Sequence, residues 1–375
     1  MEVGLLEHRR VRGRTGAAAI AGLLLAAAAF PSGAAGAVVV VQSSIQAAVD
    51  AAAPGDVVVV GPGRYHERVV IAKSAITIRG RRGAVLDASG FDVGIRASSG
   101  PVVTGPDGIE ACPQRDLHDI AVDGLRIEGA SFSGVLLTGV EGFRLSRGTY
   151  AGGEYSVYPV CSRSGIIDRN RVTGTTDGAI YVGQSRDVAV TRNIATRSAI
   201  GIEIENSTQI VVRHNVAIAN TAGIAAFVLP QLAIPATEDV VIEGNVVAHN
   251  NLPNAVAPGA GDLGAIPTGT GILASGTDRT LIRRNLVVGN DSGGIALLSN
   301  PLAPADRRID PDPDDVQSRD NVALHNGLRP DPVRATVPGA DLIYDGSGTG
   351  NCFARNRFGT EFPAGITRRF RCPAG

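Results

Sequence analysis

The chain has 375 residues, of which 44% are hydrophobic and 19% charged, and its 35 Lys and Arg nearly balance its 36 Asp and Glu. This composition is typical of a globular protein and excludes a disordered one. The net charge of −1 excludes the strongly basic surface that recognises nucleic acids or anionic membranes. Aromatic residues make up only 4%, so we expect a core of small branched side chains.

Residues 1–37 are predicted to be a signal peptide. Four arginines precede the apolar run "AAAIAGLLLAAAAF", which is shorter than the ~20 residues of a membrane span. The segment "AGA" before position 38 fits a small-residue cleavage site. An uncleaved membrane anchor is the alternative. We therefore expect a domain at 38–375 that is secreted or held at the cell envelope and that does not span a membrane after cleavage.

A short helix is predicted at about residues 43–53, within "SSIQAAVDAAAPGD". Ser43 or Ser44 can cap its N-terminus, and the following Pro-Gly pair ends it. A buried strand and a tight turn follow in "VVVVGPGRYHERVVI". His66, Glu67 and Arg68 in this segment offer catalytic chemistry, but their place in the first coil favours a structural role.

The middle of the chain repeats one template with a period of about 22 residues. Each copy has short strands with apolar residues at every second position, which is strand periodicity. The second strand of each copy ends at an asparagine: Asn170, Asn193, Asn215, Asn245, Asn285 and Asn321. Such repeats predict a β-solenoid in which these asparagines stack at turns, where Asn tolerates a left-handed backbone. The ends of a solenoid need covering, so we expect a C-terminal cap at about 340–375.

The four cysteines are expected to form disulfides in an exported protein. Three pairings are possible. We favour Cys112 with Cys161 and Cys352 with Cys372, because each pair lies in one region of the chain.

The opening "IQAAVDAAAPGDVVVVGPGRYHERVVI" and the Asn-marked coils resemble the right-handed parallel β-helix (pectin-lyase-like) superfamily. That superfamily includes pectate lyases, pectin methylesterases, alginate epimerases and copper-site accessory proteins. The segments "GGEYSVYPVC", "DGAIYVGQS", "GIEIENS" and "GTGILASG" are similar to a bacterial group of exported β-helix repeat proteins of uncertain activity. The resemblance implies an all-β, single-stranded right-handed parallel β-helix with an N-terminal helical cap.

The alginate epimerase motif Tyr-x-x-Asp-Pro-His gives the sharpest comparison of chemistry. The segment "YSVYPV" keeps Tyr155 and Pro159 but has Tyr158 at the Asp position and Val160 at the His position. Epimerisation by that route is therefore not expected.

Counted from the repeated asparagines, Tyr158, Tyr181 and Glu203 occupy equivalent positions in successive coils, so they should form one column across the stack. Equal registers of a parallel solenoid stack about 4.8 Å apart, and neighbours of inward residues point outward, so this column faces outward. The predicted catalytic residues of the patch are Glu203, Glu205, Tyr181 and Asp177. Its predicted substrate-binding residues are Glu154, Tyr158, Gln184 and Asn206.

Two long loops, at 229–239 and 251–271, are expected to flank this patch as walls of a groove. Close carboxyls raise one another's pKa, which can create a general acid and base. The phenols could stack on sugar rings or carry a proton. Calcium is the one candidate cofactor, because it binds carboxylate oxygens; no metal ligands are assigned. The alternative is an ordinary polar exterior.

The favoured function is an exported protein that binds or acts on a polysaccharide, through a groove like those of lyases, epimerases or hydrolases. Whether it is an enzyme stays open. The alternative is a non-catalytic scaffold or accessory module at the envelope. A copper-accessory role is disfavoured, because the chain has one Met and no cluster of soft ligands. We expect a monomer with no nucleic-acid partner.

Overall fold

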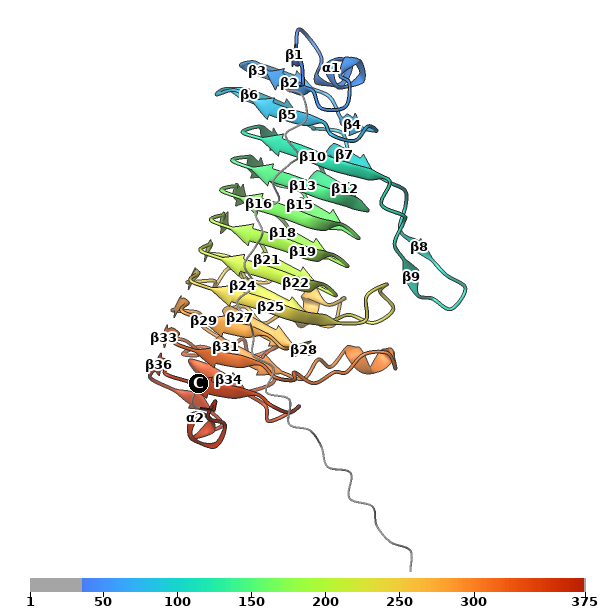
Figure 1. The fold of residues 1–375 in the computed structure, drawn as a ribbon. Coiled ribbons are helices and arrows are strands. Elements are labelled where there is room, and N and C mark those ends of the chain that lie inside the picture. The colour runs from blue at the N-terminus through green and yellow to red at the C-terminus, as the bar shows by residue number, and fades with distance from the viewer. Residues whose placement is uncertain (1–35, 374–375) are drawn as a thin grey trace, which may run out of the picture. The chain divides into compact units, whose positions relative to one another are not determined.

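The computed structural model describes residues 36–373, so the predicted signal peptide falls outside it except for its last two residues. The described chain winds into a stack of coils (Figure 1), and each regular coil contributes one strand to each of three parallel sheets. The prediction of an all-β, parallel β-helix is confirmed.

The three sheets are named here A, B and C. Sheet A contains β1 (Val38–Val40), β2 (Val57–Val60), β5 (Thr77–Gly80), β10 (Leu117–Asp123), β13 (Val140–Ser146), β16 (Arg163–Asp168), β19 (Arg186–Thr191), β22 (Thr208–Arg213), β25 (Thr237–Glu243), β28 (Thr277–Asp278), β29 (Leu281–Arg283), β32 (Gln317–Arg319) and β35 (Cys352–Ala354). Sheet B contains β3 (Gly63–His66), β6 (Ala84–Asp87), β11 (Arg126–Glu128), β14 (Thr149–Ala151), β17 (Arg171–Thr173), β20 (Ile194–Thr196), β23 (Val216–Ile218), β26 (Val246–Ala248), β30 (Leu286–Val288), β33 (Val322–Leu324) and β36 (Arg357–Phe358). Sheet C contains β4 (Val69–Ile71), β7 (Val93–Ser98), β12 (Ser133–Thr138), β15 (Tyr155–Val160), β18 (Gly178–Gly183), β21 (Ile200–Glu205), β24 (Ala222–Phe227), β27 (Thr270–Ser275), β31 (Gly293–Leu298), β34 (Leu342–Tyr344) and β37 (Glu361–Phe362).

The core lies inside the coils and is built from stacked aliphatic side chains. In sheet C, Ile180, Ile202 and Ile224 pair in consecutive coils and have no exposed surface. Their strand neighbours point out of the solenoid. The predicted core of small branched residues is thus confirmed, and the outer face of each sheet is left free to carry other chemistry.

Helix α1 (Ile45–Ala51) covers the first coil, and α2 (Ile366–Arg369) lies at the other end of the stack (Figure 1). Glu67 caps α1, because its carboxylate accepts hydrogen bonds from Ile45 N at 2.7 Å and from Ser44 Oγ at 2.8 Å. A carboxylate at this end of a helix satisfies backbone donors that have no partner within the helix. Glu67 therefore has the structural role that its position favoured.

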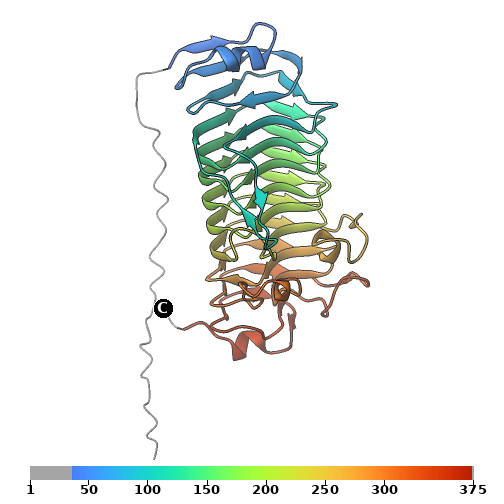
Figure 2. The same cartoon turned by 90° about the vertical axis from the view of Figure 1, so that its right-hand side faces the viewer.

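Three segments outside the coils determine what covers sheet C. Loop L1 (residues 228–236) joins β24 to β25, and loop L2 (residues 249–269) joins β26 to β27. The hairpin β8 (Val103–Thr104) and β9 (Glu110–Ala111) runs along the outside of the stack (Figure 2). It reaches L1, where Glu110 N donates to Gln231 O at 2.8 Å. L2 contains the short 3₁₀ helix η1 (Leu263–Ala265), and a second one, η2 (Ala303–Ala305), follows β31.

The favoured cysteine pairing is confirmed. Cys112 bonds Cys161, which ties the segment after the hairpin to the end of β15, and Cys352 bonds Cys372 in the C-terminal cap. The first bond joins residues 49 apart in the chain, so it restrains the hairpin as well as the coil.

The repeated asparagines form buried ladders along the turns. The first ladder consists of Asn170, Asn193, Asn215, Asn245, Asn285, Asn321 and Asn356. Each side chain donates to a backbone carbonyl of the preceding coil, and each except the last also donates to the amide oxygen of the next asparagine. A second ladder runs through Asn220, Asn250, Asn290 and Asn326.

The left-handed backbone predicted for these asparagines lies one residue earlier. Arg169, Arg192 and His214, which directly precede rungs of the first ladder, have φ of 56°, 55° and 56°. The asparagine itself is needed for its side chain, which satisfies stacked backbone groups that water cannot reach.

We predict that Asn193→Ala lowers the free energy of unfolding by about 3 kcal/mol, because it leaves several buried polar groups without partners. Asn193 Nδ2 donates to Ile167 O at 2.9 Å, and its Oδ1 accepts from Asn170 N at 2.9 Å. Urea denaturation measures the loss. The half-buried last rung, Asn356→Ala, serves as the control and should cost clearly less, since water can replace its bonds; equal losses would contradict the ladder's role.

Candidate functional site

Three consecutive strands of sheet C, β15, β18 and β21, bring the predicted acidic and aromatic residues together. On the outer face Tyr181 pairs with Glu203, and Gly183 pairs with Glu205. Tyr158 precedes Tyr181 in the same column, because Val160 of its strand pairs with Gly183. The predicted register is therefore confirmed.

These side chains point out of the solenoid but are not open to solvent. Only 1% of Glu203, 4% of Tyr181 and 6% of Glu205 is exposed. The sequence suggested an open groove between two loops, whereas L2 lies over the patch. Leu263 and Ile266 of this loop form one apolar cluster with the strand residues Ile200 and Phe227.

Gln184 and Asn206, predicted to bind substrate, hold the segments that cover the site. Asn206 Nδ2 donates to Leu229 O of L1 at 2.9 Å, and Gln184 Oε1 accepts from Ala233 N of L1 at 2.8 Å. Gln184 Nε2 also donates to Glu110 Oε2 on the hairpin at 2.6 Å. Both side chains are buried and fix the edge of the site rather than facing its centre.

An aromatic cluster borders the acidic residues. The rings of Tyr158 and Tyr181 stack with centroids 4.3 Å apart and planes 10° apart. Tyr155 lies 4.5 Å from Tyr158, and Phe132 lies 5.3 Å from Tyr158 on the preceding coil. The phenol of Tyr181 extends over Gly183, where any Cβ would collide with its hydroxyl. Glycine at 183 is therefore what allows Tyr181 to reach the next coil.

Two phenols donate hydrogen bonds to two carboxyls. Tyr181 Oη donates to Glu205 Oε1 at 2.7 Å, and Tyr155 Oη donates to Asp177 Oδ2 at 2.9 Å. Burial and the nearby carboxyls raise the pKa of both tyrosines above the ordinary value of 10, so both stay protonated donors at neutral pH. Each carboxyl thus has one oxygen fixed by a neutral donor.

The carboxyl groups themselves hold protons more strongly than usual. Burial, followed by the charges of Asp177, Glu205 and Asp262, raises the pKa of Glu203 well above 4.5. Burial also raises the pKa of Glu205 to about 8 and, with Asp262 and Glu154 contributing, that of Asp177 to about 6. The charged neighbours that raise these pKa values are all acidic, and the rise differs in extent among the three carboxyls.

Two carboxyl oxygens in this site are buried without a hydrogen-bond partner, Glu203 Oε2 and Asp177 Oδ1. Glu203 Oε2 lies over Gly178, where a Cβ would be only 2.5 Å away. Buried polar atoms without partners are rare in folded proteins and call for an explanation. A bound proton, substrate group or cation would satisfy them.

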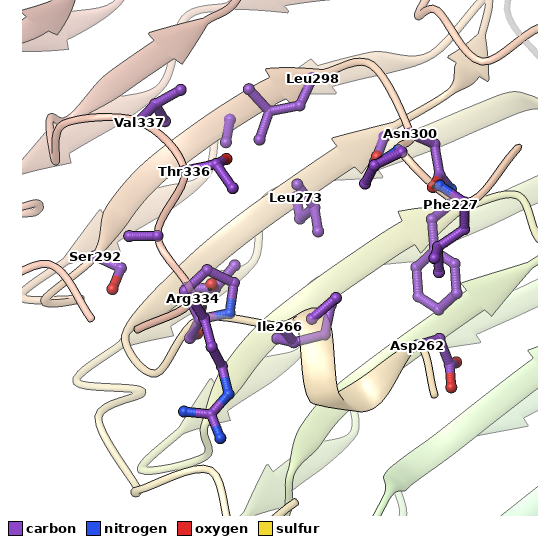
Figure 3. A pocket seen from close by; sticks show the side chains of 18 of the residues that line it. Phe227, Asp262, Ile266, Leu273, Ser292, Leu298, Asn300, Arg334, Thr336 and Val337 are labelled. Carbon is purple, nitrogen blue, oxygen red and sulfur yellow. Dashed lines mark hydrogen bonds between the residues drawn. The ribbon is translucent and has the colours of Figure 1, made fainter. Parts of the chain in front are cut away.

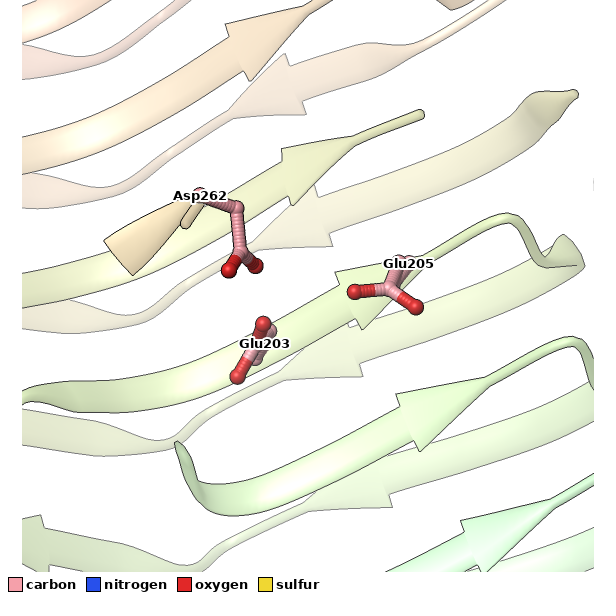
Figure 4. Close-up of side chains that lie close together, drawn as sticks. All are labelled: Glu203, Glu205 and Asp262. Carbon is pink, nitrogen blue, oxygen red and sulfur yellow. The ribbon is translucent and has the colours of Figure 1, made fainter. Parts of the chain in front are cut away.

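Asp262 completes the acidic cluster from L2 (Figure 4). Glu203, Glu205 and Asp262 each place a carboxylate oxygen within 4.8 Å of the other two. An all-oxygen donor set is what calcium and other hard cations prefer. If a cation enters this site, these three residues would hold it, and its charge would offset the repulsion among them.

Sequence reasoning missed several members of the site. Asp262 lies in a loop that was expected only as a wall, and Tyr155 was noticed only as a motif residue. Phe132 and Glu110 lie outside the repeats used to assign the register. Glu154, predicted to bind substrate, is exposed at the rim, and its charge contributes to the raised pKa of Asp177.

A sequence profile described as "Right handed beta helix region" matches residues 102–228, which include β15, β18 and β21. The chain has the fold of a right-handed parallel β-helix. Curated protein sequences contain no significant match. Among the described residues, no helix is long and apolar enough to cross a membrane.

Solved structures with the same fold include several carbohydrate-active proteins. The A-module of the mannuronan C-5 epimerase AlgE4 from Azotobacter vinelandii aligns over 84% of this chain and 90% of its own, with a TM-score of 0.59 and 16% identity. DFA-IIIase from Arthrobacter chlorophenolicus A6, without its lid, aligns over 90% and 91%, with a TM-score of 0.53 and 13% identity. The GH136 lacto-N-biosidase from Eubacterium ramulus aligns over 84% and 64%, with a TM-score of 0.54 and 12% identity. At these identities the likeness shows the fold alone.

We predict that stability falls as pH rises through the neutral range and that Glu205→Gln removes part of this fall. A Glu whose pKa is raised from 4.5 to about 8 by folding binds its proton more tightly in the folded state. Its contribution is fully present below 4.5 and is lost as pH rises toward about 8. Thermal unfolding at pH 5 and pH 8 should show a difference for the wild type that the variant reduces by on the order of 2 kcal/mol.

The control for this experiment is Glu141→Gln, which changes an acid on β13 of sheet A, away from the site. It should leave the pH dependence close to that of the wild type. An identical pH dependence in Glu205→Gln and the wild type would refute the raised pKa.

Proposed function

We propose that this protein is a carbohydrate-active enzyme that works outside the cytoplasm and cleaves a glycosidic bond by general acid–base catalysis. The observation that carries the proposal is the buried group of carboxyls beside stacked tyrosines, with pKa values raised to different extents. The two disulfides fit an oxidising compartment. The carbohydrate-active neighbours with this fold support the substrate class without identifying the substrate.

The two central carboxyls suit different roles. Glu203, whose pKa is raised furthest, is the proposed general acid that donates a proton to the leaving oxygen. Asp177 ionises near pH 6 and is held by Tyr155, so it is the proposed base that activates water. Two carboxyls of different pKa are the usual pair for glycoside hydrolysis.

The charge of the site favours a neutral polysaccharide. The carboxyls already raise one another's pKa, and a uronate substrate would add a further negative charge to the same space. The half-buried Tyr155 and Tyr158 offer ring surface of the kind that stacks on sugars. Because L2 covers the carboxyls, substrate entry requires this loop to move away from sheet C.

We predict that Glu203→Gln and Asp177→Asn each lower glycan cleavage by about 100-fold or more, since general acid or base catalysis contributes factors of this size. Release of reducing ends from a panel of neutral polysaccharides measures hydrolysis, and ultraviolet absorbance of unsaturated products from uronate polysaccharides detects elimination. Glu141→Gln on β13 of sheet A, a Glu→Gln change on another face, is the matched control and should keep full activity. A wild type without activity or glycan binding across the panel would favour the scaffold alternative.

The pH dependence of kcat/KM gives a second test. Activity should rise as Asp177 ionises, with an acidic limb near its pKa of about 6. It should fall again at higher pH, as Glu203 loses its proton. Tyr155→Phe removes a hydrogen bond that stabilises the ionised Asp177, so this variant should move the acidic limb to higher pH. An unmoved limb would exclude Asp177 as the base.

A further inference from the structure

A cavity of about 530 Å³ lies beside the acidic cluster on the same face of sheet C (Figure 3). Its floor is the outer face of β27, β31 and β34, where Leu273, Ala296 and Ile343 pair in register. Loop L2 and the segment 333–337 form its walls. A volume of this size suits a small molecule or one substituent of a larger one.

The cavity exists because the side chains of one outward column become smaller and more apolar along the stack. The register that carries Tyr181 and Glu203 continues through Ala225, Leu273 and Ala296. Tyrosines fill the face in the earlier coils, whereas small and aliphatic residues leave it hollow in the later ones. The same sheet therefore has an acidic, aromatic half and an apolar half.

Several polar side chains around the cavity are engaged by the protein itself. Arg334 Nη2 donates to Val256 O at 2.6 Å and its Nε to Gly264 O at 3.2 Å, so its guanidinium binds L2 to the opposite wall. Asn300 Nδ2 donates to Val228 O at 2.5 Å. Sugar hydroxyls need many hydrogen-bond partners, so a mainly apolar lining with several of its polar groups occupied suits an apolar group better.

The cavity adjoins the proposed catalytic site. Asp262 lines the cavity and also belongs to the acidic cluster. Phe227 lines it as well and pairs directly with Glu205 in the neighbouring strand. A ligand that fills the cavity would therefore have its other end beside the carboxyls.

We propose that this cavity binds an apolar substituent of the sugar substrate, an acyl chain or an aryl group, and so selects substituted glycans over bare ones. The inference rests on the proposed function for its sugar, while the cavity itself can be tested without any activity. The floor residue Ala296 and the wall residue Val337 are the positions that decide its size and polarity.

The test uses the neutral fluorescent probe N-phenyl-1-naphthylamine with the full chain. We expect saturable binding to the wild type, weakened by about tenfold or more in Ala296→Phe, which fills the floor, and in Val337→Asp, which adds a charge to the wall. Val337 lies in a loop, so its variant keeps the proposal testable if the strand variant does not fold. Val246→Phe adds the same ring to an exposed position of sheet B and should bind the probe like the wild type.

Competition with sugar derivatives then identifies the group that binds. Decanoyl sucrose and 2-naphthyl glucoside, below their micelle concentrations, distinguish an acyl from an aryl ligand, and displacement of the probe by one of them supports the proposal. Absence of saturable probe binding, equal binding in all variants, or equal displacement by unsubstituted sucrose would overturn it.

Glu203→Gln separates this inference from the proposed function. The variant should bind the probe normally, because Glu203 does not line the cavity. Unchanged glycan cleavage in Glu203→Gln would count against the catalytic assignment alone. Probe binding that is unaffected by Ala296→Phe and Val337→Asp would count against the cavity alone.

Discussion

In-register stacking of parallel coils is the constraint on which the structure depends. Backbone hydrogen bonds hold neighbouring strands about 4.8 Å apart, so residues one repeat apart become direct neighbours. The 4.3 Å stacking of the Tyr158 and Tyr181 rings and the asparagine ladders both follow from this spacing. The same rule places Glu203 beside Tyr181 and sets Glu205 against Phe227, which joins the acidic half of the face to the apolar half.

The buried carboxyls of the site destabilise the folded protein, and interactions elsewhere in the fold offset this cost. Carboxyls buried among other carboxyls oppose ionisation, and buried oxygens without partners cost free energy. A continuous aliphatic core runs past the site on the inner face of the same strands, and the asparagine ladders lie at the turns of the same coils. The stabilising interactions and the unfavourable ones thus occupy different parts of the same coils, which separates folding from chemistry.

Much of this arrangement could be predicted from the sequence, because it follows a period. The repeated asparagines and the alternation of Ile202 and Ile204 around Glu203 are enough to infer the coils, their register and the outward column. Asp262 could not be placed, because L2 has no repeat to count from. The burial of Glu203 could not be predicted from the sequence either, since it depends on how L2 folds back onto sheet C. The left-handed backbone was assigned one residue too late, since the turn and the ladder use adjacent positions.

The repeat has a consequence for how such a protein can evolve. Asn193 and Asn215 are 22 residues apart and carry equivalent rungs, so a deletion of one whole coil between them would leave the ladder able to close again. Such a shortened chain would keep its architecture but lose Glu203 and Glu205, for which no neighbouring coil carries a substitute in the same columns. The coils are structurally equivalent to one another, whereas Glu203 and Glu205 occur in one coil alone. Gains and losses of coils would therefore change activity far more readily than fold.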